Sequence, residues 1–340
     1  MTFGFARRVA VLAAAALLTT TLTQSAEASL GTWRVELLPS PAGYPGATGW
    51  VRGTDSHGGF AGNLVLDGAS QVVTWSGTQA TVHPLPAGLQ SPAVADENSA
   101  GTVLGDVADA SFQRQVFLLE AGKYRLLPRP ADRPYVSAAA INERGDVVAT
   151  ASGWSAEDPE VLLWRAEDRE HPVVITGGPY LSATDVDDDG SVLADSFPGA
   201  VLWKDGTFTR LTAPPGAGSV HAAAVRTGQV VGNFATADQT PGGVQWRTPA
   251  DPVVLPGSGA AFGVNRTGLV VGYGDVSTGR FSPLRVWLGT QPYGTLPPAP
   301  GFAAAWAEVV GDDDVVAGTV ANSEPTTNTG RPAVWRYSSH

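Results

Sequence analysis

The residues that could carry chemistry in this sequence form no recognised catalytic or metal-binding pattern. The five histidines, His57, His83, His171, His221 and His340, show no metal-ligand spacing. The sequence contains no nucleophile elbow, no metalloprotease helix motif and no phosphate-binding loop. It also contains no cysteine, so a disulfide framework and a lipid-bearing cysteine are both excluded.

One stretch resembles the start of a calcium-binding loop, because carboxylates alternate at Asp185, Asp187 and Asp189 before a glycine. Such a loop needs a glutamate at its twelfth position, where this chain has Ser196. Asp187 also occupies the entry of a repeated turn described below. We therefore interpret the stretch as an acidic turn and expect no cofactor, with calcium as the alternative.

Aromatic residues offer another kind of site, because their rings can stack on sugar rings or on an apolar ligand. Trp50 and Trp306 lie eight residues before the turn-glycine position of two repeats, and Tyr135 and Tyr180 lie ten before it in two others. His221 lies just before an equivalent strand. These five residues are the candidate ligand-binding set. The alternative is that they simply pack against neighbouring repeats.

The element that would position these residues is a hairpin, seen best in Ala138–Ala149. Two apolar arms flank Asn142 and Gly145, and asparagine followed by glycine favours a tight turn. The second arm contains the β-branched residues Val147 and Val148, which favour a strand.

Related copies of this hairpin recur along the chain. Each ends its second arm on a small residue, 38 to 46 residues after the previous one: Gly62, Gly105, Ala149, Ala194, Gly232, Gly272 and Gly318. A short apolar run ending in an aromatic residue follows each copy, at Trp75, Phe117, Trp164, Trp203, Trp246, Trp287 and Trp335. Most units then end near Leu-Pro or Leu-Thr, as at Leu85-Pro86, Leu127-Pro128, Leu211-Thr212, Leu255-Pro256 and Leu296-Pro297.

Each unit thus has four strand-length segments in about 40–45 residues, which is typical of a propeller blade. The last unit lacks its fourth segment, and Trp33–Pro39 near the other end of the chain can supply it. The sequence therefore predicts an all-β, seven-bladed β-propeller of four-stranded blades, closed by pairing of this N-terminal strand with the C-terminal blade. We expect the third-strand aromatics to pack between blades.

The repeats resemble those of the HAF-repeat extracellular proteins, which centre on A-x-x-[IV]-N-x-x-G-x-V-V-G. The stretch Val264–Gly272, VNRTGLVVG, is the closest copy, and the resemblance extends from about Gly43 to Trp335. It implies a secreted, β-propeller-like repeat domain. It implies no particular activity and no catalytic residues.

Residues 1–28 have the features of an export signal: Arg7-Arg8, the apolar run Val9–Leu18 and the small-x-small site Ala26–Ala28. We expect one β-propeller domain over residues 29–340, secreted, monomeric and not inserted in a membrane. The formal net charge is −11, which argues against nucleic acid as a partner because such binding rests on lysine and arginine.

The hypothesis that these features favour is a non-catalytic binding or interaction module at the cell exterior, for an extracellular glycan, envelope or protein ligand. The alternative is a propeller enzyme, a lyase or glycosidase, with carboxylates or a histidine at the channel mouth. Residues in suitable loops for this alternative are Asp106, Asp109, Asp195, Asp275 and His221. Glycosidase chemistry needs two carboxyls about 5–10 Å apart.

Overall fold

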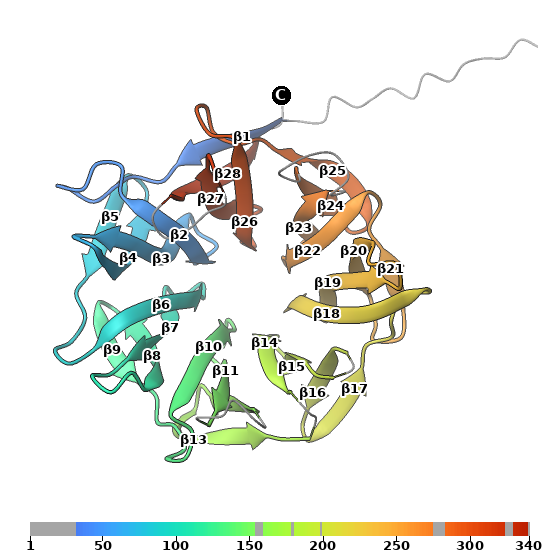
Figure 1. Ribbon diagram of the computed structural model, residues 1–340, viewed down its shortest axis with the longest axis horizontal. Coiled ribbons are helices and arrows are strands. Elements are labelled where there is room, and N and C mark those ends of the chain that lie inside the picture. Colours follow the sequence, from blue (N-terminus) through green and yellow to red (C-terminus); the bar gives the residue numbers. More distant parts are fainter. Residues whose placement is uncertain are drawn as a thin grey trace, which may run out of the picture. The chain divides into compact units, whose positions relative to one another are not determined.

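The computed structural model describes residues 32–153, 159–177, 180–197, 199–274, 283–323 and 329–338. The elements within these ranges are all strands, β1 to β28 in chain order (Figure 1). None of the described residues belongs to a helix that could cross a bilayer. The all-β prediction is confirmed. The predicted leader, residues 1–28, and Asp275 lie outside the described residues.

The strands pair antiparallel in runs of four, which we call quartets and number from the N-terminus. The first three quartets are β2 (Thr48–Thr54), β3 (Gly59–Leu66), β4 (Ala69–Ser76) and β5 (Gln79–His83); β6 (Gln90–Glu97), β7 (Val103–Ala108), β8 (Arg114–Glu120) and β9 (Lys123–Leu126); β10 (Tyr135–Ile141), β11 (Val147–Ser152), β12 (Glu160–Arg165) and β13 (Asp168–Ile175).

The next three quartets are β14 (Ser182–Val186), β15 (Val192–Asp195), β16 (Val201–Lys204) and β17 (Thr207–Arg210); β18 (Ala217–Arg226), β19 (Gln229–Thr236), β20 (Pro241–Trp246) and β21 (Pro252–Val254); β22 (Ser258–Val264), β23 (Leu269–Gly274), β24 (Leu284–Leu288) and β25 (Gln291–Leu296). The seventh consists of β26 (Ala304–Val310), β27 (Val316–Ala321), β28 (Arg331–Ser338) and β1 (Thr32–Leu37).

Seven separate sheets were expected, but the structure has five four-stranded sheets and one eight-stranded sheet. The second and third quartets share the larger sheet because the crossing between them brings Tyr135 alongside Arg114, and β8 and β10 pair there in parallel. The Arg114 amide donates to the carbonyl of Pro134 at 2.9 Å, which fixes this junction. Five separate blades of four strands are thus established.

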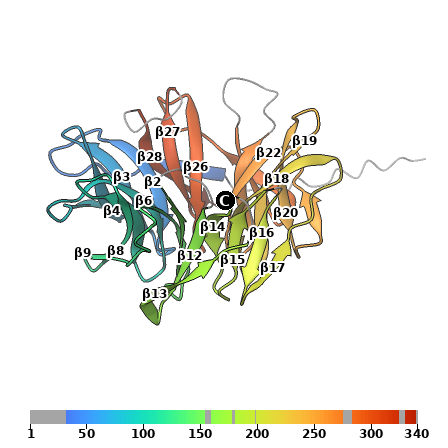
Figure 2. The same cartoon turned by 60° about the horizontal axis from the view of Figure 1, so that its bottom comes forward.

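The sheets stand in a ring, with the first strand of each quartet nearest the centre (Figure 1). The same ring turned by 60° shows the first and seventh quartets, β2–β5 and β26–β28, side by side (Figure 2). Apolar side chains fill the space between neighbours: Val51 and Phe60 of the first quartet cluster with Val315, Ala317 and Val334 of the seventh. The core is therefore divided among the interfaces between sheets. This is the architecture of a β-propeller.

The two ends of the described chain close the ring. β1 pairs antiparallel with β28, and Arg34 faces Arg336 while Val35 faces Trp335. The predicted pairing between Trp33–Pro39 and the last quartet is therefore found. A closed ring leaves no terminal sheet with an uncovered apolar face.

The repeated turns form as their sequence predicts. Asn142 Oδ1 accepts hydrogen bonds from the amides of Arg144 (3.1 Å) and Asp146 (2.8 Å), which closes the turn. Gly145 has φ +89°, a conformation that glycine adopts without steric cost. The position that ends the second arm must be small for a different reason. A Cβ at Gly62 would lie 2.0 Å from the Trp50 carbonyl oxygen on the inner strand, so the two strands could not keep this spacing.

The third-strand aromatics pack between quartets, as predicted, and five of them also make an unforeseen hydrogen bond. Each of these buried indoles donates its N–H to the carbonyl that follows the outer strand of the preceding quartet. The pairs are Trp75–Pro39 (2.9 Å), Trp164–Pro128 (3.1 Å), Trp246–Thr212 (2.7 Å), Trp287–Pro256 (3.1 Å) and Trp335–Pro297 (2.7 Å). In these five pairs, the third-strand tryptophan and the Pro or Thr after the outer strand are thus the two partners of one contact. We call this contact the latch.

A second contact joins the quartets nearer the centre. The residue after the small anchor, on the second strand, accepts a hydrogen bond from an inner-strand amide of the next quartet. These pairs are Asn63–Val94 (2.8 Å), Asp106–Ala138 (3.1 Å), Thr150–Ala183 (2.9 Å), Asp195–Ala222 (2.9 Å) and Asn233–Ala261 (2.7 Å). The inner strand is a sheet edge, so amides that point away from the sheet need such a partner.

The latch predicts a measurable cost for removing one indole N–H. Trp335→Phe keeps an aromatic ring, as Phe117 does naturally in the second quartet, but loses the donor to Pro297. We expect a loss of about 1–3 kcal/mol in the free energy of unfolding, from the hydrogen bond and the smaller ring. Urea denaturation measures this loss.

The matched control is Trp203→Phe, because Trp203 Nε1 makes no hydrogen bond to a described residue. Its cost should be smaller by about the value of one hydrogen bond. Equal costs for the two variants would show that the latch contributes only packing.

Candidate functional site

A β-bulge at the same position of every inner strand shapes the centre of the ring. The strand register skips one residue there, which leaves it unpaired. The skipped residues are Arg52, Ala95, Ala139, Thr184, Ala223, Phe262 and Glu308. All seven line one central cavity of about 200 Å³. The repeat therefore builds a channel wall whose chemistry depends on a single residue per quartet.

Four of these seven bulge residues are small or apolar, Thr184 is polar, and Arg52 and Glu308 form an ion pair. Arg52 Nη1 lies 2.6 Å from Glu308 Oε2, joining the first and seventh quartets. Arg52 also lies over the ring of Trp50, with its Cζ 5.6 Å from the centroid. Burial raises the pKa of Glu308, while the nearby Arg52 opposes that rise.

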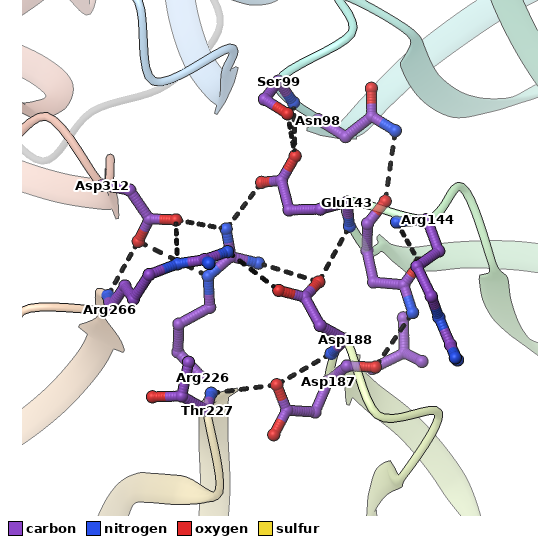
Figure 3. Close-up of polar contacts among 12 residues, drawn as sticks. Asn98, Ser99, Glu143, Arg144, Asp187, Asp188, Arg226, Thr227, Arg266 and Asp312 are labelled. Carbon is purple, nitrogen blue, oxygen red and sulfur yellow. Dashed lines mark hydrogen bonds and ion pairs between the residues drawn. The ribbon is translucent and has the colours of Figure 1, made fainter.

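An arginine-centred cluster covers one end of the channel, where the inner hairpin turns lie (Figure 3). Arg226 lies 2.5 Å from both Glu143 and Asp312 and 3.6 Å from Asp188. Arg266 adds contacts to Asp188 at 3.0 Å and to Asp312 at 3.4 Å. The turns of five quartets, the third to the seventh, are thus joined by charge. We call this group the turn-end cluster.

The turn-end cluster depends on the fifth quartet. Like the seventh quartet, which has Gly311, it lacks Asn or Asp at the turn entry. Val225 stands there instead of Asn or Asp, and Asp187 of the preceding quartet replaces the missing acceptor. Its carboxylate accepts from the amides of Thr227 (2.9 Å) and Gly228 (2.6 Å). Arg226, within this turn, reaches the centre of the ring (Figure 3).

The aspartates considered for calcium point to separate partners. Asp185 accepts from the Val225 amide at 2.7 Å, Asp187 holds the neighbouring turn, and Asp189 pairs with Lys204. No group of three or more metal-ligating side chains is found among the described residues. Each of the three carboxylates thus has a structural partner of its own.

Asp96 and Asp185 occupy the same position of the second and fourth quartets, one residue after the bulge. Each carboxylate accepts two amides: Asp96 from Ile141 (3.0 Å) and Glu97 (2.8 Å), and Asp185 from Val225 and Val186 (both 2.7 Å). Burial raises the pKa of each to about 7, in spite of these hydrogen bonds. The charge of Asp185 adds to the rise at Asp96.

Glu97 takes the place that aliphatic residues such as Ile141 and Val264 hold in other quartets. Glu97 is 8% exposed, and its Oε2 atom is buried without a hydrogen-bond partner among the described residues. Burial, with smaller contributions from Asp55 and Asp96, raises its pKa to about 8. The carboxyl is therefore mostly protonated at neutral pH.

At the other end of the channel, strand register places one set of residues in equivalent positions. Each faces the second-strand residue that follows the small anchor: Trp50, Ala93, Ser137, Ser182, His221, Ala260 and Trp306. We call these residues the mouth ring. Three of the five candidates from the sequence, Trp50, Trp306 and His221, therefore share one layer and break its otherwise small-residue pattern.

The candidate tyrosines lie farther out, because they are two positions earlier along their strands. Tyr135 is the first residue of β10, and Tyr180 lies just before β14 with 71% of its surface exposed. Neither the tyrosines nor the mouth-ring residues line the central cavity, so the difference between them is one of strand position. The structure thus separates the tyrosines from the mouth ring.

Trp50 also lines a groove of about 830 Å³ between the first and second quartets. Its wall combines apolar residues with polar side chains, namely Asn63, Gln71, Gln90 and Arg114. Arg114 is held in place by Asp106, and its side chain is 30% exposed. Trp306, the equivalent residue of the seventh quartet, does not line this groove.

The carboxylates considered for catalysis have structural partners. Asp106 holds Arg114 and accepts from the Ala138 amide, while Asp109 accepts from amides of its own turn at Ser111 (2.7 Å) and Gln113 (3.0 Å). Asp195 also accepts from an amide, that of Ala222 (2.9 Å), but it differs from the other two in contacting a histidine as well. Its Oδ2 lies 3.3 Å from Nδ1 of His221, which is 64% exposed, so the two form a dyad open to solvent.

Sequence reasoning missed Arg226, Asp96, Glu97 and the groove. The sequence did mark the repeat of Arg226 as unusual, since it lacks the Asn or Asp at the turn entry. That difference alone does not show where the Arg226 side chain reaches. Asp96 and Asp185 could have been found by aligning the repeats on their bulges, which requires knowing the register.

No protein-family model and no curated protein matches this sequence. Solved structures do resemble the fold. An oligogalacturonate lyase in complex with manganese matches with a TM-score of 0.62 and 12% identity, covering 91% of this chain and 98% of its own. The β-propeller domain of the Trilobed protease from Pyrococcus furiosus matches with a TM-score of 0.57 and 10% identity, covering 85% and 93%. At such identities the likeness shows the fold alone.

The buried carboxyls predict how stability depends on pH. Asp96, Glu97 and Asp185 keep protons in the folded state that the unfolded chain, with carboxyl pKa values of about 4, has already released. The free energy of unfolding should therefore fall as pH rises from about 4 to about 8. Thermal denaturation should give a higher Tm at pH 5 than at pH 8.

Glu97→Gln should flatten this slope, because a neutral amide replaces the carboxyl that must ionise. Glu120→Gln, at an exposed turn, is the control and should leave the slope unchanged. A Tm that rises steadily up to pH 8, or a slope that Glu97→Gln does not alter, would contradict the assignment.

Proposed function

We propose that this chain is a secreted binding module that takes an extracellular saccharide in the groove beside Trp50, without catalysis. The groove itself carries this proposal. It has room for a sugar unit, an aromatic ring on its wall and several hydrogen-bonding side chains, the combination typical of small-molecule sites. Hydroxyl groups would pair with Gln71 and Gln90, while the ring of Trp50 would stack on a sugar face.

Several features of the sequence support the extracellular setting. Residues 1–28 have the pattern of an export signal, and the hairpin repeats resemble those of HAF-repeat extracellular proteins. The net charge of −11 is unsuited to nucleic acid. We propose a monomer that acts outside the cell, with a glycan or envelope component as its partner.

We further propose that each quartet is one blade, so that the ring has seven. The eight-stranded sheet would then be two blades joined at one parallel pair, Tyr135 with Arg114. The recurrence of the bulge in all seven inner strands supports this count. The N-terminal strand β1 would complete the last blade.

A second candidate function is catalysis, and the dyad of His221 and Asp195 favours it. Asp195 orients the imidazole, which leaves its other nitrogen free to exchange a proton with a ligand at the mouth ring. This would suit a lyase or glycosidase. A turnover assay with any saccharide that binds distinguishes the two functions, since a binding module leaves it intact.

A glycan-binding screen with the protein of residues 29–340 tests the proposal, followed by calorimetric titration with the saccharides that bind. Trp50→Ala should weaken binding at least about tenfold, which corresponds to about 1.4 kcal/mol of lost stacking. Circular dichroism checks that the variant is folded.

Trp306→Ala is the matched control, because Trp306 has the same strand position but lies outside the groove. It should leave the affinity unchanged. Failure of every saccharide and envelope fraction to bind, or an equal loss in both variants, would overturn the proposed site.

A further inference from the structure

The negatively charged side chains that line the central cavity outnumber the positively charged ones. Arg52 is neutralised by Glu308, and Arg226 is neutralised by Glu143 and Asp312. The three remaining acids on this wall are in no ion pair with a described residue: Asp96, Glu97 and Asp185. The cavity therefore has an excess of acidic groups.

Two of these acids are fixed in place and border open space. Asp96 and Asp185 each accept one hydrogen bond from a backbone amide of their own strand and one from an amide of the next quartet. Neither carboxylate can therefore rotate away. Both residues are only half-buried as a whole, because they border the channel. Both line the same central cavity, where the charge of Asp185 raises the pKa of Asp96 and the charge of Arg226 lowers it. A positive charge between them would relieve that repulsion.

Glu97 provides an independent sign of a missing partner. Buried carboxyl oxygens normally have a hydrogen-bond donor, and leaving one without costs free energy. Glu97 Oε2 has none among the described residues, although the residue lines the cavity and is more than nine-tenths buried. A ligand with several N–H donors would supply it.

We propose that the central cavity binds a small organic cation, through an ammonium or guanidinium group held by Asp96 and Asp185. The chain already contains a model for this interaction, since Arg226 is held by three carboxylates at the turn end (Figure 3). A cavity of about 200 Å³ has the volume of about seven water molecules, which suits a short amine.

A metal ion fits less well. No group of three metal-ligating side chains occurs among the described residues, and each carboxylate of Asp96 and Asp185 already accepts two amides. An ammonium or guanidinium group is bound by fewer and more widely spaced carboxylates than a metal ion requires.

Calorimetric titration of the residue 29–340 protein with agmatine, which has one guanidinium and one ammonium group, tests the proposal. We expect saturable binding that is at least about fivefold tighter at pH 8 than at pH 6, with net proton release. The groups that set this dependence are Asp96, Glu97 and Asp185, with Asp55, Asp187 and Arg226 facing them.

The variant Asp96→Asn/Asp185→Asn keeps the side-chain shape and should weaken agmatine binding at least about tenfold. Asp109→Asn, in the turn between β7 and β8 and outside the cavity lining, is the control and should bind normally. Trp50→Ala should also bind agmatine normally, which separates this site from the saccharide groove. Glu97→Gln gives a second, independent test if the double variant does not fold.

Three results would overturn the proposal. Agmatine may give no saturable heat, it may bind the Asn variants as tightly as the original protein, or calcium chloride may bind at these residues while agmatine does not. The last result would assign the cavity to a divalent metal.

Discussion

The latch between a third-strand indole and the carbonyl after the preceding outer strand is the contact on which this ring depends. A single quartet leaves apolar surface exposed on its faces and has little stability of its own. The indole both fills the interface and places its N–H on a neighbouring backbone carbonyl, which satisfies a donor that is otherwise buried. Because the acceptor belongs to the backbone, Thr212 can replace proline in one latch without losing it.

The same constraint decides which polar residues remain available for function. Second-strand side chains such as Asp106 and Asp195 are used to satisfy inner-strand amides of the next quartet. A position near the channel is therefore not in itself evidence that a carboxylate is catalytic. The informative residues are those that depart from the repeat, such as Trp50 in the mouth ring, Asp96 on the cavity wall and Arg226 in the turn-end cluster. The groove and the cavity are both built from such departures.

Sequence periodicity predicted the all-β fold, the turns and the pairing of the chain ends, because these depend on residue types at fixed spacing. It also placed Trp50 and Trp306 at equivalent positions, but it put His221 just before the strand β18 that in fact contains it. It could not predict the junction between β8 and β10, which depends on the path of one crossing. Nor could it show that Asp195 contacts His221, or that Trp50 and Trp306 differ in what they line. These facts depend on side-chain direction, and a bulge changes direction without a sequence signature.

Closure of the ring by its own two ends is the claim on which the sites depend, and a designed disulfide tests it most directly. The chain has no cysteine, so Arg34→Cys/Arg336→Cys introduces the only two thiols, at facing positions of β1 and β28. Mild oxidation should give an intramolecular disulfide in the monomer and raise its Tm, while either single variant gives none. Thiols that stay free in the monomer, or that link only separate molecules, would contradict the closure.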